Sequence, residues 1–454
     1  MTQPDTVDIA EVVETQGASW FAISTFLLCC LVMLVDGFDN QAINYAAPLI
    51  VKDWGIGREL MTPVFAFSIL GWMLGSIGFS MIGDRIGRRN SIILAVLAFG
   101  VLTLAIPLAR NLAELSALRF LAALGIGGGI PMVVALTADY AQAKSRGLKI
   151  TILYIGYTVG SSGGGFLAAD LTPAYGWKSI FLAGGLAALA IGLVLLFALP
   201  ESVRYLVLKR KGQERILAIA RKLKPRAAFD SETRFVIQES VQQGMPVKYL
   251  FTDGRAAMTI FLWFALGFSF VTHFFISAWL TTLLSEYSGQ MTIPVAQRTS
   301  ALFQMGAAFG IGMGWLLDRR GIPAVTSVML LGALPVAALG LVDSGTAVTM
   351  VLAAISGILV LGSAPGLNAI AGMVYPTFMR CTGAGAAFAA ARIGALIGPV
   401  IAGSLIALHV PLNLIFIVAA LPMLAAAAMT FMLDRSMTPD AAREMASKSA
   451  MARH

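Results

Sequence analysis

The sequence is poor in charged side chains and in the residues that hold metals or form disulfides. Only 12% of its 454 residues are charged, whereas 58% are hydrophobic and the mean hydropathy is +0.81. A water-soluble domain carries about 25% charged residues. Three cysteines and three histidines are too few for a disulfide framework or a zinc cage. The composition therefore excludes a disordered protein, a nucleic-acid-binding protein and an ordinary cytosolic enzyme.

Long apolar runs fill most of the chain and predict an all-α integral membrane protein. A bilayer-spanning helix needs about 20 apolar residues, and a wide hydropathy window finds about twelve such runs. The first six lie near residues 21–50, 61–82, 90–109, 112–136, 147–170 and 177–199. The second six lie near residues 256–285, 296–317, 322–342, 346–372, 378–407 and 409–433. We predict twelve transmembrane helices in two six-helix bundles, at 21–199 and 256–433.

Basic residues concentrate on one side of the predicted bundles. Twenty-five of the 32 lysines and arginines fall in the even-to-odd loops, the central loop and the C-terminal tail, against five in the opposite loops. The positive-inside rule places the basic side in the cytoplasm. The N-terminal tail has no lysine or arginine and so lacks the basic region of a cleaved signal peptide. We expect an inner (plasma) membrane protein with three cytoplasmic segments: the N-terminal tail (1–20), the central loop (200–255) and the C-terminal tail (434–454).

The basic residues of the central loop, between the two sets of apolar runs, have two possible interpretations. It carries nine lysines and arginines between residues 204 and 226. We expect a lipid-facing cytoplasmic segment that follows the positive-inside rule, and a specific regulatory site is the alternative.

The two halves carry the same motifs at one offset. A Gly-Asp-Arg-Ile-Gly-Arg-Arg segment closes the second run, and a weaker copy closes the eighth. Asp84 and Asp318 in these copies are 234 residues apart, and Tyr140 and Tyr375 are 235 residues apart. One offset that serves two motifs indicates duplicated halves of the same orientation.

These motifs resemble those of the major facilitator superfamily. They are the loop at 84–89 with its second copy, Arg119 followed by the glycine-rich residues 125–131, and the Pro-Glu-Ser sequence at 200–202. The Asp-Gly-Phe-Asp sequence at 36–39 resembles that of the aromatic acid:proton symporters, which import benzoate- and hydroxybenzoate-type anions. The resemblance implies the major facilitator fold and proton-coupled transport of an aromatic carboxylate. We expect no cofactor besides the coupling proton, no metal, no nucleic-acid partner, and a monomer in the bilayer.

Two acidic residues lie within the first predicted span. An aspartate at the centre of a span costs about 2.5–3.5 kcal/mol, and such residues are functional candidates by default. Asp36 and Asp39 are three residues apart and share a helix face. A low dielectric and mutual repulsion favour the protonated form of one of them. We predict that this pair couples transport to protons; the alternative is that one of them bonds the backbone of a neighbouring helix.

Arg119 in the fourth run and Arg392 in the eleventh are cations well inside predicted spans. An arginine cannot shed its charge at ordinary pH, so it needs an acid, carbonyl groups or a ligand carboxylate as a partner. We predict that one pairs with Asp36 or Asp39 in the empty protein and that the other meets the substrate carboxylate. A structural ion pair or a helix-end contact is the alternative for each.

Aromatic and polar residues within the runs are further candidates for substrate contact. His273 is a candidate to contact substrate or relay a proton, with a packing histidine as the alternative. Trp279 and Tyr157 offer faces on which a flat ring can stack, although most aromatic residues in spans face lipid or neighbouring helices. The candidates for hydrogen bonds to ring hydroxyls are Asn44, Gln304 and Asn368.

The repeated loop motif is a candidate gate. The resemblance implies that its acidic and basic side chains pair across the cytoplasmic seam between the halves in one conformation and separate in the other. A simple positive-inside anchor explains the arginines but not the aspartates. The predicted gating residues are Asp84, Arg85, Arg88, Arg89, Asp318 and Arg319. Asp139, Arg146, Glu201 and Arg204 are candidates to join the same charge network.

The functional prediction is a secondary transporter that imports an aromatic carboxylate with protons by alternating access. The alternative within the superfamily is a proton-coupled transporter of sugars or other organic solutes. Two acids in the first span and arginines in the fourth and eleventh favour an anion. An intramembrane enzyme is disfavoured because the sequence lacks the zinc-protease and serine-hydrolase motifs.

Overall fold

The structure, a computed structural model, describes residues 6–437 with short gaps. The gaps are residues 18, 211, 226, 228, 231–232, 238–246, 253, 288–290, 342–344 and 376–378. The side chains of Ile311, Asp318, Arg380 and Cys381 are also outside the description. The predicted gating side chain Asp318 and most of the expected C-terminal tail therefore lie outside the described part of the chain.

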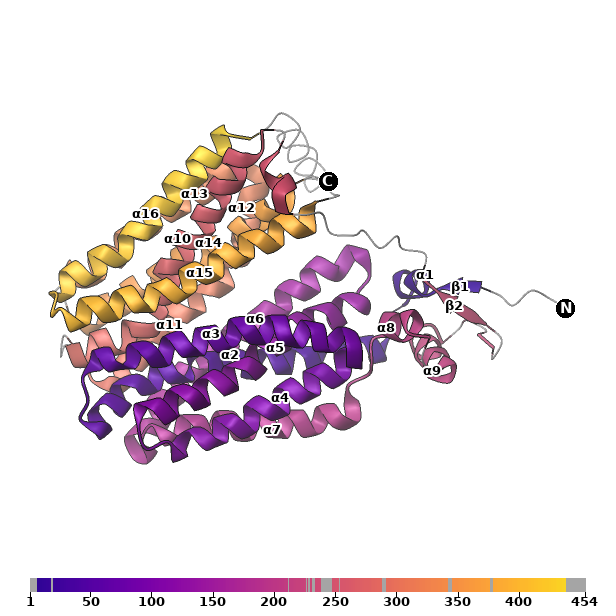
Figure 1. The fold of residues 1–454 in the computed structure, drawn as a ribbon, viewed down its shortest axis with the longest axis horizontal. Coiled ribbons are helices and arrows are strands. Elements are labelled where there is room, and N and C mark those ends of the chain that lie inside the picture. Colours follow the sequence, from indigo (N-terminus) through magenta and orange to yellow (C-terminus); the bar gives the residue numbers. More distant parts are fainter. Residues whose placement is uncertain are drawn as a thin grey trace. The chain divides into compact units, whose positions relative to one another are not determined.

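Long helices follow the apolar runs of the first half (Figure 1). They are α2 (Trp20–Trp54), α3 (Thr62–Ile86), α4 (Arg88–Ala105), α5 (Leu112–Asp139), α6 (Ala143–Tyr175) and α7 (Lys178–Ala198). Short 3₁₀ turns, η1 (Arg58–Met61) and η2 (Ile106–Leu108), lie at the ends of α3 and α4. Asn111 caps the N-terminus of α5: its side chain accepts a hydrogen bond from the Glu114 backbone N–H.

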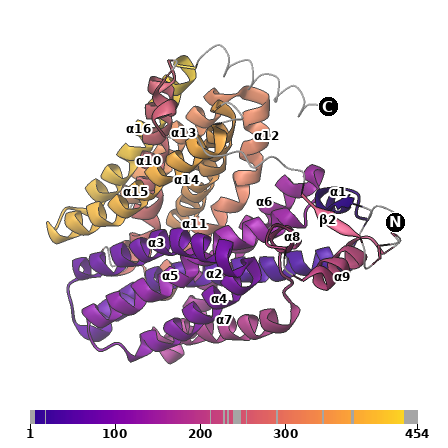
Figure 2. The ribbon, with the colours of Figure 1, turned by 45° about the vertical axis from the view of Figure 1, so that its right-hand side comes forward.

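The second half has a corresponding set of helices, seen in Figure 1 and again in Figure 2. They are α10 (Ala256–Thr282), α11 (Ile293–Met305), α12 (Gly310–Arg320), α13 (Ile322–Leu341), α14 (Thr346–Val374), α15 (Arg380–Ala407) and α16 (Leu412–Arg435). A π-helical turn, Leu283–Tyr287, extends α10, and a 3₁₀ turn, Gly306–Phe309, joins α11 to α12. Of the helical segments described, ten are long and apolar enough to cross a membrane.

The 3₁₀ turn between α11 and α12 lies where that segment touches α14. A Cβ on Gly306 would lie 2.0 Å from the Gly357 backbone, and a Cβ on Gly357 would lie 2.0 Å from the Phe303 carbonyl. Backbones this close require glycine on both sides. The glycine pair therefore fixes how α11 and α12 pack against α14.

Contacts divide the chain into two compact units whose boundaries fall inside helices. The first unit holds residues 1–40, 70–160 and 181–241, and the second holds residues 41–69, 161–180 and 242–454. The later parts of α2 and α6 and the start of α3 thus belong with the helices of the second half. Tight packing of Gly403 on α15 against Thr62 at the start of α3 is one such contact.

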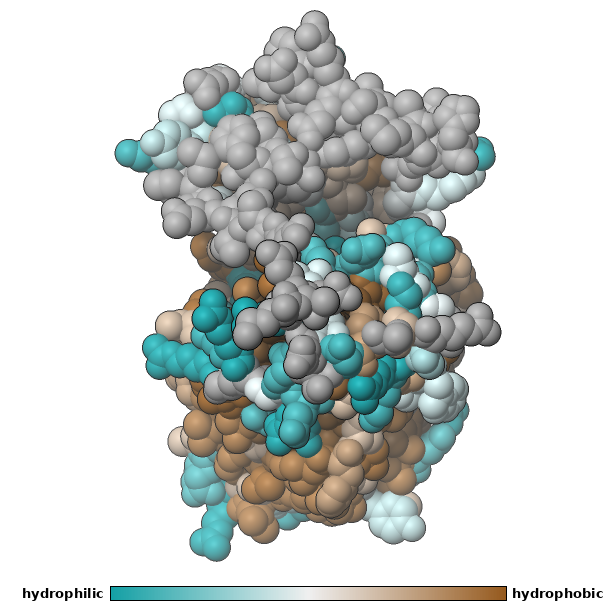
Figure 3. Space-filling model, turned by 90° about the vertical axis from the view of Figure 1, so that its right-hand side faces the viewer, coloured by the Kyte–Doolittle hydropathy of each residue, from teal (hydrophilic) through white to brown (hydrophobic). Residues whose placement is uncertain are grey.

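The N-terminal tail and the central loop fold together, which differs from the predicted tail and lipid-facing loop. Strand β1 (Thr6–Asp8) pairs in parallel with β2 (Arg234–Val236). Helix α1 (Ile9–Glu14) contacts α8 (Val203–Leu208) and α9 (Gln213–Leu223). We call these five elements the amino-terminal cap. Figure 3 faces the end of the molecule that carries it and shows hydrophilic side chains gathered there.

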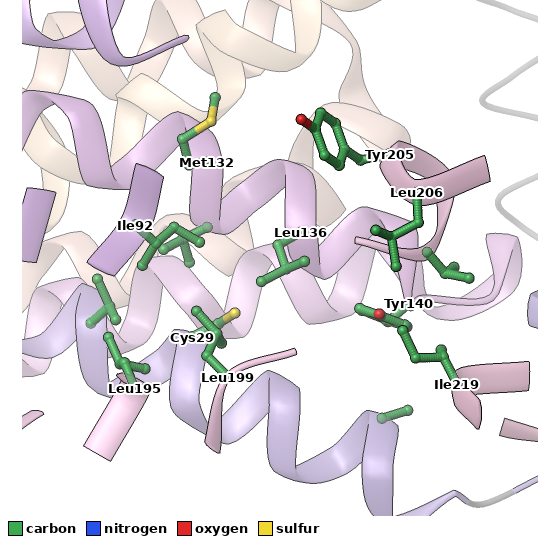
Figure 4. Close-up of a cluster of buried hydrophobic side chains, with 14 of the residues drawn as sticks. Cys29, Ile92, Met132, Leu136, Tyr140, Leu195, Leu199, Tyr205, Leu206 and Ile219 are labelled. Atoms are coloured by element: carbon green, nitrogen blue, oxygen red, sulfur yellow. The ribbon is translucent and has the colours of Figure 1, made fainter. Parts of the chain in front are cut away.

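Apolar side chains hold the amino-terminal cap together. Helix α9 is amphipathic, and its apolar face, which includes Ile216 and Leu223, is buried in a cluster with Ile9, Val12 and Val13 of α1. Figure 4 shows how this cluster continues from Ile219 through Leu206 and Tyr140 into the helices of the first unit. The apolar face of the central loop is therefore covered by the protein's own N-terminal segment, while Arg215, Arg221 and Lys222 of α9 are exposed.

Truncating Ile9 tests the packing of the cap. Ile9 is fully buried, so Ile9→Ala should cost about 2–4 kcal/mol of local stability. Amides of α1, α9 and β2 should then exchange hydrogen faster, as measured by exchange and mass spectrometry. Glu11→Ala, on the exposed face of the same helix, is the matched control and should leave exchange nearly unchanged. Equal exchange in the two variants would show that α1 does not hold the cap.

Candidate functional site

A buried ion pair joins α2 to α5 in the first unit. Arg119 Nη1 lies 3.1 Å from Asp39 Oδ2, and Nη2 donates a 3.2 Å hydrogen bond to the Asp39 carbonyl oxygen. Asp39 is 0% exposed and Arg119 is 1% exposed. On α4, the buried Thr103 hydroxyl donates a 3.0 Å hydrogen bond to the other carboxylate oxygen, Asp39 Oδ1. The two carboxylate oxygens of Asp39 are thus bonded to different helices: Oδ1 to Thr103 on α4 and Oδ2 to Arg119 on α5.

Arg119 keeps capacity for a further partner. Its Nε has no hydrogen-bond partner among the described residues, although it is buried. The guanidinium also lies over the Phe181 ring, 5.8 Å from the centroid, which adds a cation–π contact. A permanently charged, planar donor group with an unused N–H is suited to grip a second carboxylate.

Asp36 has surroundings unlike those of Asp39, one helical turn away. It is 1% exposed, and its Oδ2 lacks a hydrogen-bond partner within the described part of the chain. The Oδ1 atom faces Gly129 of α5. Tyr157 on α6 is partly buried and packs against the hydrophobic cluster that contains Val32. The two acids that the sequence places on one helix face therefore differ: Asp39 is paired with a cation, and Asp36 is buried with an unused oxygen.

Two of the predicted contact residues in the second unit are bonded to neighbouring helices. Trp279 on α10 is fully buried, donates a 3.0 Å hydrogen bond to the Pro399 carbonyl and meets Phe65 edge-on at 5.1 Å. In this conformation its ring has no face open for stacking. Gln304 on α11 donates a 3.0 Å hydrogen bond to Ser277 Oγ. Both residues join helices within this unit.

Among the remaining predicted contact residues, His273 and Asn368 each have one buried polar atom without a described partner. On α10, His273 stacks on Phe274 at 4.6 Å, and its Nδ1 has no hydrogen-bond partner among the residues described. On α14, Asn368 Oδ1 likewise has no hydrogen-bond partner within the described part of the chain. Asn44 on α2 donates a 2.6 Å hydrogen bond to Gln41, a residue of its own helix. Arg392 lies half-buried on α15. The substrate-contact roles of these residues stay predictions.

A charged cluster lies where α4 begins and α5 ends. Arg88 donates to the Asp139 carboxylate and, at 3.0 Å, to the Ala135 carbonyl. The same carboxylate accepts a hydrogen bond from Ser202, and Arg204 Nε lies 3.9 Å from its second oxygen. Asp139 and Arg204 thus join the arginines of the loop motif, as the sequence indicates. The partners described for Arg88 belong to the first half of the chain.

Glu201 forms the second centre of this cluster. Its Oε1 accepts hydrogen bonds from the backbone N–H groups of Arg89 at 3.1 Å and Ser202 at 2.8 Å. Arg89 Nε in turn donates a 2.7 Å hydrogen bond to the Leu199 carbonyl. The Tyr140 hydroxyl donates to the Glu201 carbonyl. Charges at the ends of α4, α5 and α7 are therefore tied into one network, and Arg146 lies 3.8 Å from Glu14 nearby.

The turn between α3 and α4 explains part of the loop motif. Gly87 has φ of +98°, and a Cβ there would lie 2.1 Å from the Glu201 carboxylate, so only glycine fits. The Tyr205 hydroxyl donates a 2.8 Å hydrogen bond to the Arg85 carbonyl. The side chains of Asp84 and Arg85 are exposed, so they are accessible to partners elsewhere.

In the second copy of the motif, Arg319 on α12 lies over the Trp315 ring, 4.2 Å from its centroid. This places one cation of the copy against an aromatic face of its own helix, whereas the Arg88 side chain binds the Asp139 carboxylate and the Arg89 side chain binds the Leu199 carbonyl. The gating roles of both copies stay predictions.

A second polar cluster, within the second unit, was not predicted. Gln297 on α11 is fully buried, donates a 2.9 Å hydrogen bond to the Tyr45 carbonyl and accepts one of 3.2 Å from Thr172. The neighbouring Arg298 pairs with Asp170 at 2.8 Å, and both side chains are largely exposed. We call these five residues the α11 contact cluster: Gln297, Arg298, Thr172, Asp170 and Tyr45. The sequence feature that could have indicated this cluster is Gln297, a polar residue inside an apolar run.

Known proteins are similar to this chain in sequence. The family model described as Major Facilitator Superfamily matches residues 29–342. A gallate transporter of Pseudomonas putida is 35% identical over 93% of this chain and 94% of its own length. A 4-hydroxybenzoate transporter of the same species is 31% identical over 86% of this chain and 88% of its own length.

Among solved structures, a bacterial homologue of the human lysosomal transporter Spinster, in an inward-facing unoccupied conformation, has a TM-score of 0.74 at 16% identity. It covers 93% of this chain and 98% of that one. This likeness and the family match confirm the predicted fold class, an all-α membrane protein of twelve helices in two six-helix bundles.

The ion pair predicts unequal effects of removing its two members. Asp39→Asn leaves a buried guanidinium that cannot lose its charge, so it should lower stability by about 3–5 kcal/mol. Arg119→Met should cost less, because an aspartate left alone can take up a proton. Thermal unfolding of the purified protein in detergent measures both.

The double variant Asp39→Asn, Arg119→Met is the control, and it should recover most of the stability lost in Asp39→Asn. Additive losses in the double variant would show that the two residues are not energetically coupled.

Proposed function

This chain belongs to the major facilitator superfamily, and we propose that it imports an aromatic carboxylate together with protons by alternating access. The observation that carries the proposal is the buried Arg119–Asp39 pair. The named relatives transport gallate and 4-hydroxybenzoate, which share a benzene ring and a carboxylate. An anion of this kind needs a fixed cation in an apolar interior, and Arg119 supplies one.

The coupling step is an exchange of carboxylates at Arg119. A proton that reaches Asp39 from the outer side neutralises it and weakens its hold on the guanidinium. Arg119 then binds the substrate carboxylate through parallel N–H···O bonds, with its unused Nε among the donors. On the inner side Asp39 loses its proton, pairs with Arg119 again and displaces the anion. Thr103 keeps the carboxylate oriented toward Arg119 throughout.

Proton number sets the driving force. One proton carried with one monovalent anion moves no net charge, so only the pH gradient drives uptake, at about 1.4 kcal/mol per pH unit. A second proton would add about 2.3 kcal/mol per 100 mV of membrane potential. Asp36, buried with an unused oxygen, is the candidate carrier of that second proton.

We assign the protein to the inner membrane, as a monomer with both termini in the cytoplasm. In this orientation the amino-terminal cap and the Arg88–Asp139 network lie on the cytoplasmic side, and the α11 contact cluster lies on the outer side. The cluster must part whenever the outer side opens. Its buried Gln297 bonds carry more of the closure energy than the exposed Arg298–Asp170 pair, because exposed ion pairs contribute about 0–1 kcal/mol.

Uptake into proteoliposomes tests the transport proposal. With an inward proton gradient, the wild type should accumulate radiolabelled benzoate, 4-hydroxybenzoate or gallate, whereas Asp39→Asn should lose proton-driven accumulation. The loss follows because asparagine neither gains nor loses a proton, so it cannot couple the state of Arg119 to the proton gradient. Xylose and other sugars, offered in parallel, test the alternative of a sugar transporter. Undiminished accumulation by Asp39→Asn, or uptake of sugars alone, would contradict the proposal.

A cysteine reporter tests the outer closure. Ala301 is fully buried, beside Gly165, so Ala301→Cys in a background without native cysteines should react slowly with a membrane-impermeant maleimide added outside. Adding Gln297→Leu removes two buried hydrogen bonds and should speed labelling about ten-fold. Arg298→Ala is the control and should change the rate by less than about three-fold. Equal rates in all three proteins would exclude this closure.

A further inference from the structure

The glycine-rich stretch of α5 is not uniform in its packing. A Cβ on Gly125, Gly127 or Gly128 would lie 2.8, 2.0 or 2.3 Å from an atom of α3 or α4. These three glycines are therefore required by close approach of helices. Gly129 differs, because the atoms nearest to its Cβ position are Val32 Cγ1 at 3.9 Å and Asp36 Oδ1 at 4.0 Å. Close packing does not explain this glycine.

The space left beside Gly129 is bordered by the Asp36 carboxyl group, whose Oδ1 is the oxygen nearer to Gly129 and whose Oδ2 is the oxygen without a described partner. Gly129 and Asp36 are both buried, and Asp36 Oδ2 is without a hydrogen-bond partner among the described residues. Buried polar atoms are nearly always hydrogen-bonded to protein, water or ligand. A small group that enters this space can therefore satisfy the Asp36 carboxyl group.

The position of this space relative to the Arg119–Asp39 pair indicates which substrate group enters it. Asp36 and Asp39 are one helical turn apart on α2, about 4.5 Å along the axis. This is comparable to the width of one benzene ring. A ring whose carboxylate is held by Arg119 can thus direct a substituent toward Asp36.

We propose that the space bounded by Gly129, Val32 and Asp36 is a subsite for a ring hydroxyl of the aromatic substrate, with Gly129 setting the room available. The inference rests on the proposed function, because it assumes that the carboxylate binds Arg119. The Asp36 carboxyl group accepts a hydrogen bond from the hydroxyl when ionised and donates one when protonated. A subsite of this kind discriminates strongly against a ring without the hydroxyl, which leaves a buried polar group unpaired.

The experiment measures selectivity between gallate, which has ring hydroxyls, and benzoate, which has none. KM for proton-driven uptake is determined in proteoliposomes with wild type, Gly129→Ala and Gly129→Val. The added methyl groups of valine enter the space beside Asp36, so Gly129→Val should raise KM for gallate about ten-fold more than KM for benzoate. Gly129→Ala, which makes only ordinary contacts, should shift the same ratio by a smaller factor.

Gly78→Val on α3 is the matched control. Its Cβ position has no atom within 4 Å, so the variant tests the effect of a valine in a helix without filling the subsite. This control should keep the wild-type ratio of the two KM values. An equal rise of both KM values in Gly129→Val, or an unchanged ratio, would overturn the subsite.

Equilibrium dialysis of both acids against the purified protein separates this inference from the proposed function. If the wild type binds gallate more tightly than benzoate, and Gly129→Val removes that preference, the subsite stands even where no uptake occurs. Absence of uptake by the wild type would then contradict the transport proposal alone. Absence of gallate binding to the wild type would overturn the subsite.

Discussion

A guanidinium that cannot be discharged, held in an apolar interior, constrains the rest of this structure. Arg119 needs a partner for its permanent charge, and in the structure that partner is Asp39. Because the pair is fully buried, an anion replaces Asp39 only if that carboxylate is first neutralised. In the proposed mechanism, protons and organic anions are therefore linked by this single side chain.

Two aspartates on one helix face have separate tasks in this account. Asp39 is held by Thr103 and Arg119, so its charge state decides whether the cation is available. Asp36 lies beside Gly129 through its Oδ1, and its Oδ2 has no hydrogen-bond partner among the described residues, so the carboxyl group is available to a ligand or a proton. The packing of α5 creates this difference, because its glycines bring α3 and α4 close and leave room next to α2.

The sequence predicted features that depend on local composition, and it missed those that depend on distant contacts. Asp39 and Arg119 were found because ionised residues in apolar runs need each other. Thr103 was missed because a hydroxyl in a helix most often bonds its own backbone. The cap was missed because β1 pairs with a strand more than 200 residues away. The unequal surroundings of Asp36 and Asp39 follow from helix packing, which periodicity does not report.

Proton uptake on substrate binding tests the carboxylate exchange most directly. Calorimetric titration of the purified protein with an aromatic acid, repeated in buffers of different ionisation enthalpy, counts the protons taken up per anion bound. At a pH where the empty protein holds the Arg119–Asp39 pair, we expect the carboxylate exchange to take up about one proton per anion bound, and we expect no such uptake in Asp39→Asn. Binding of the anion by the wild type without proton uptake would contradict it.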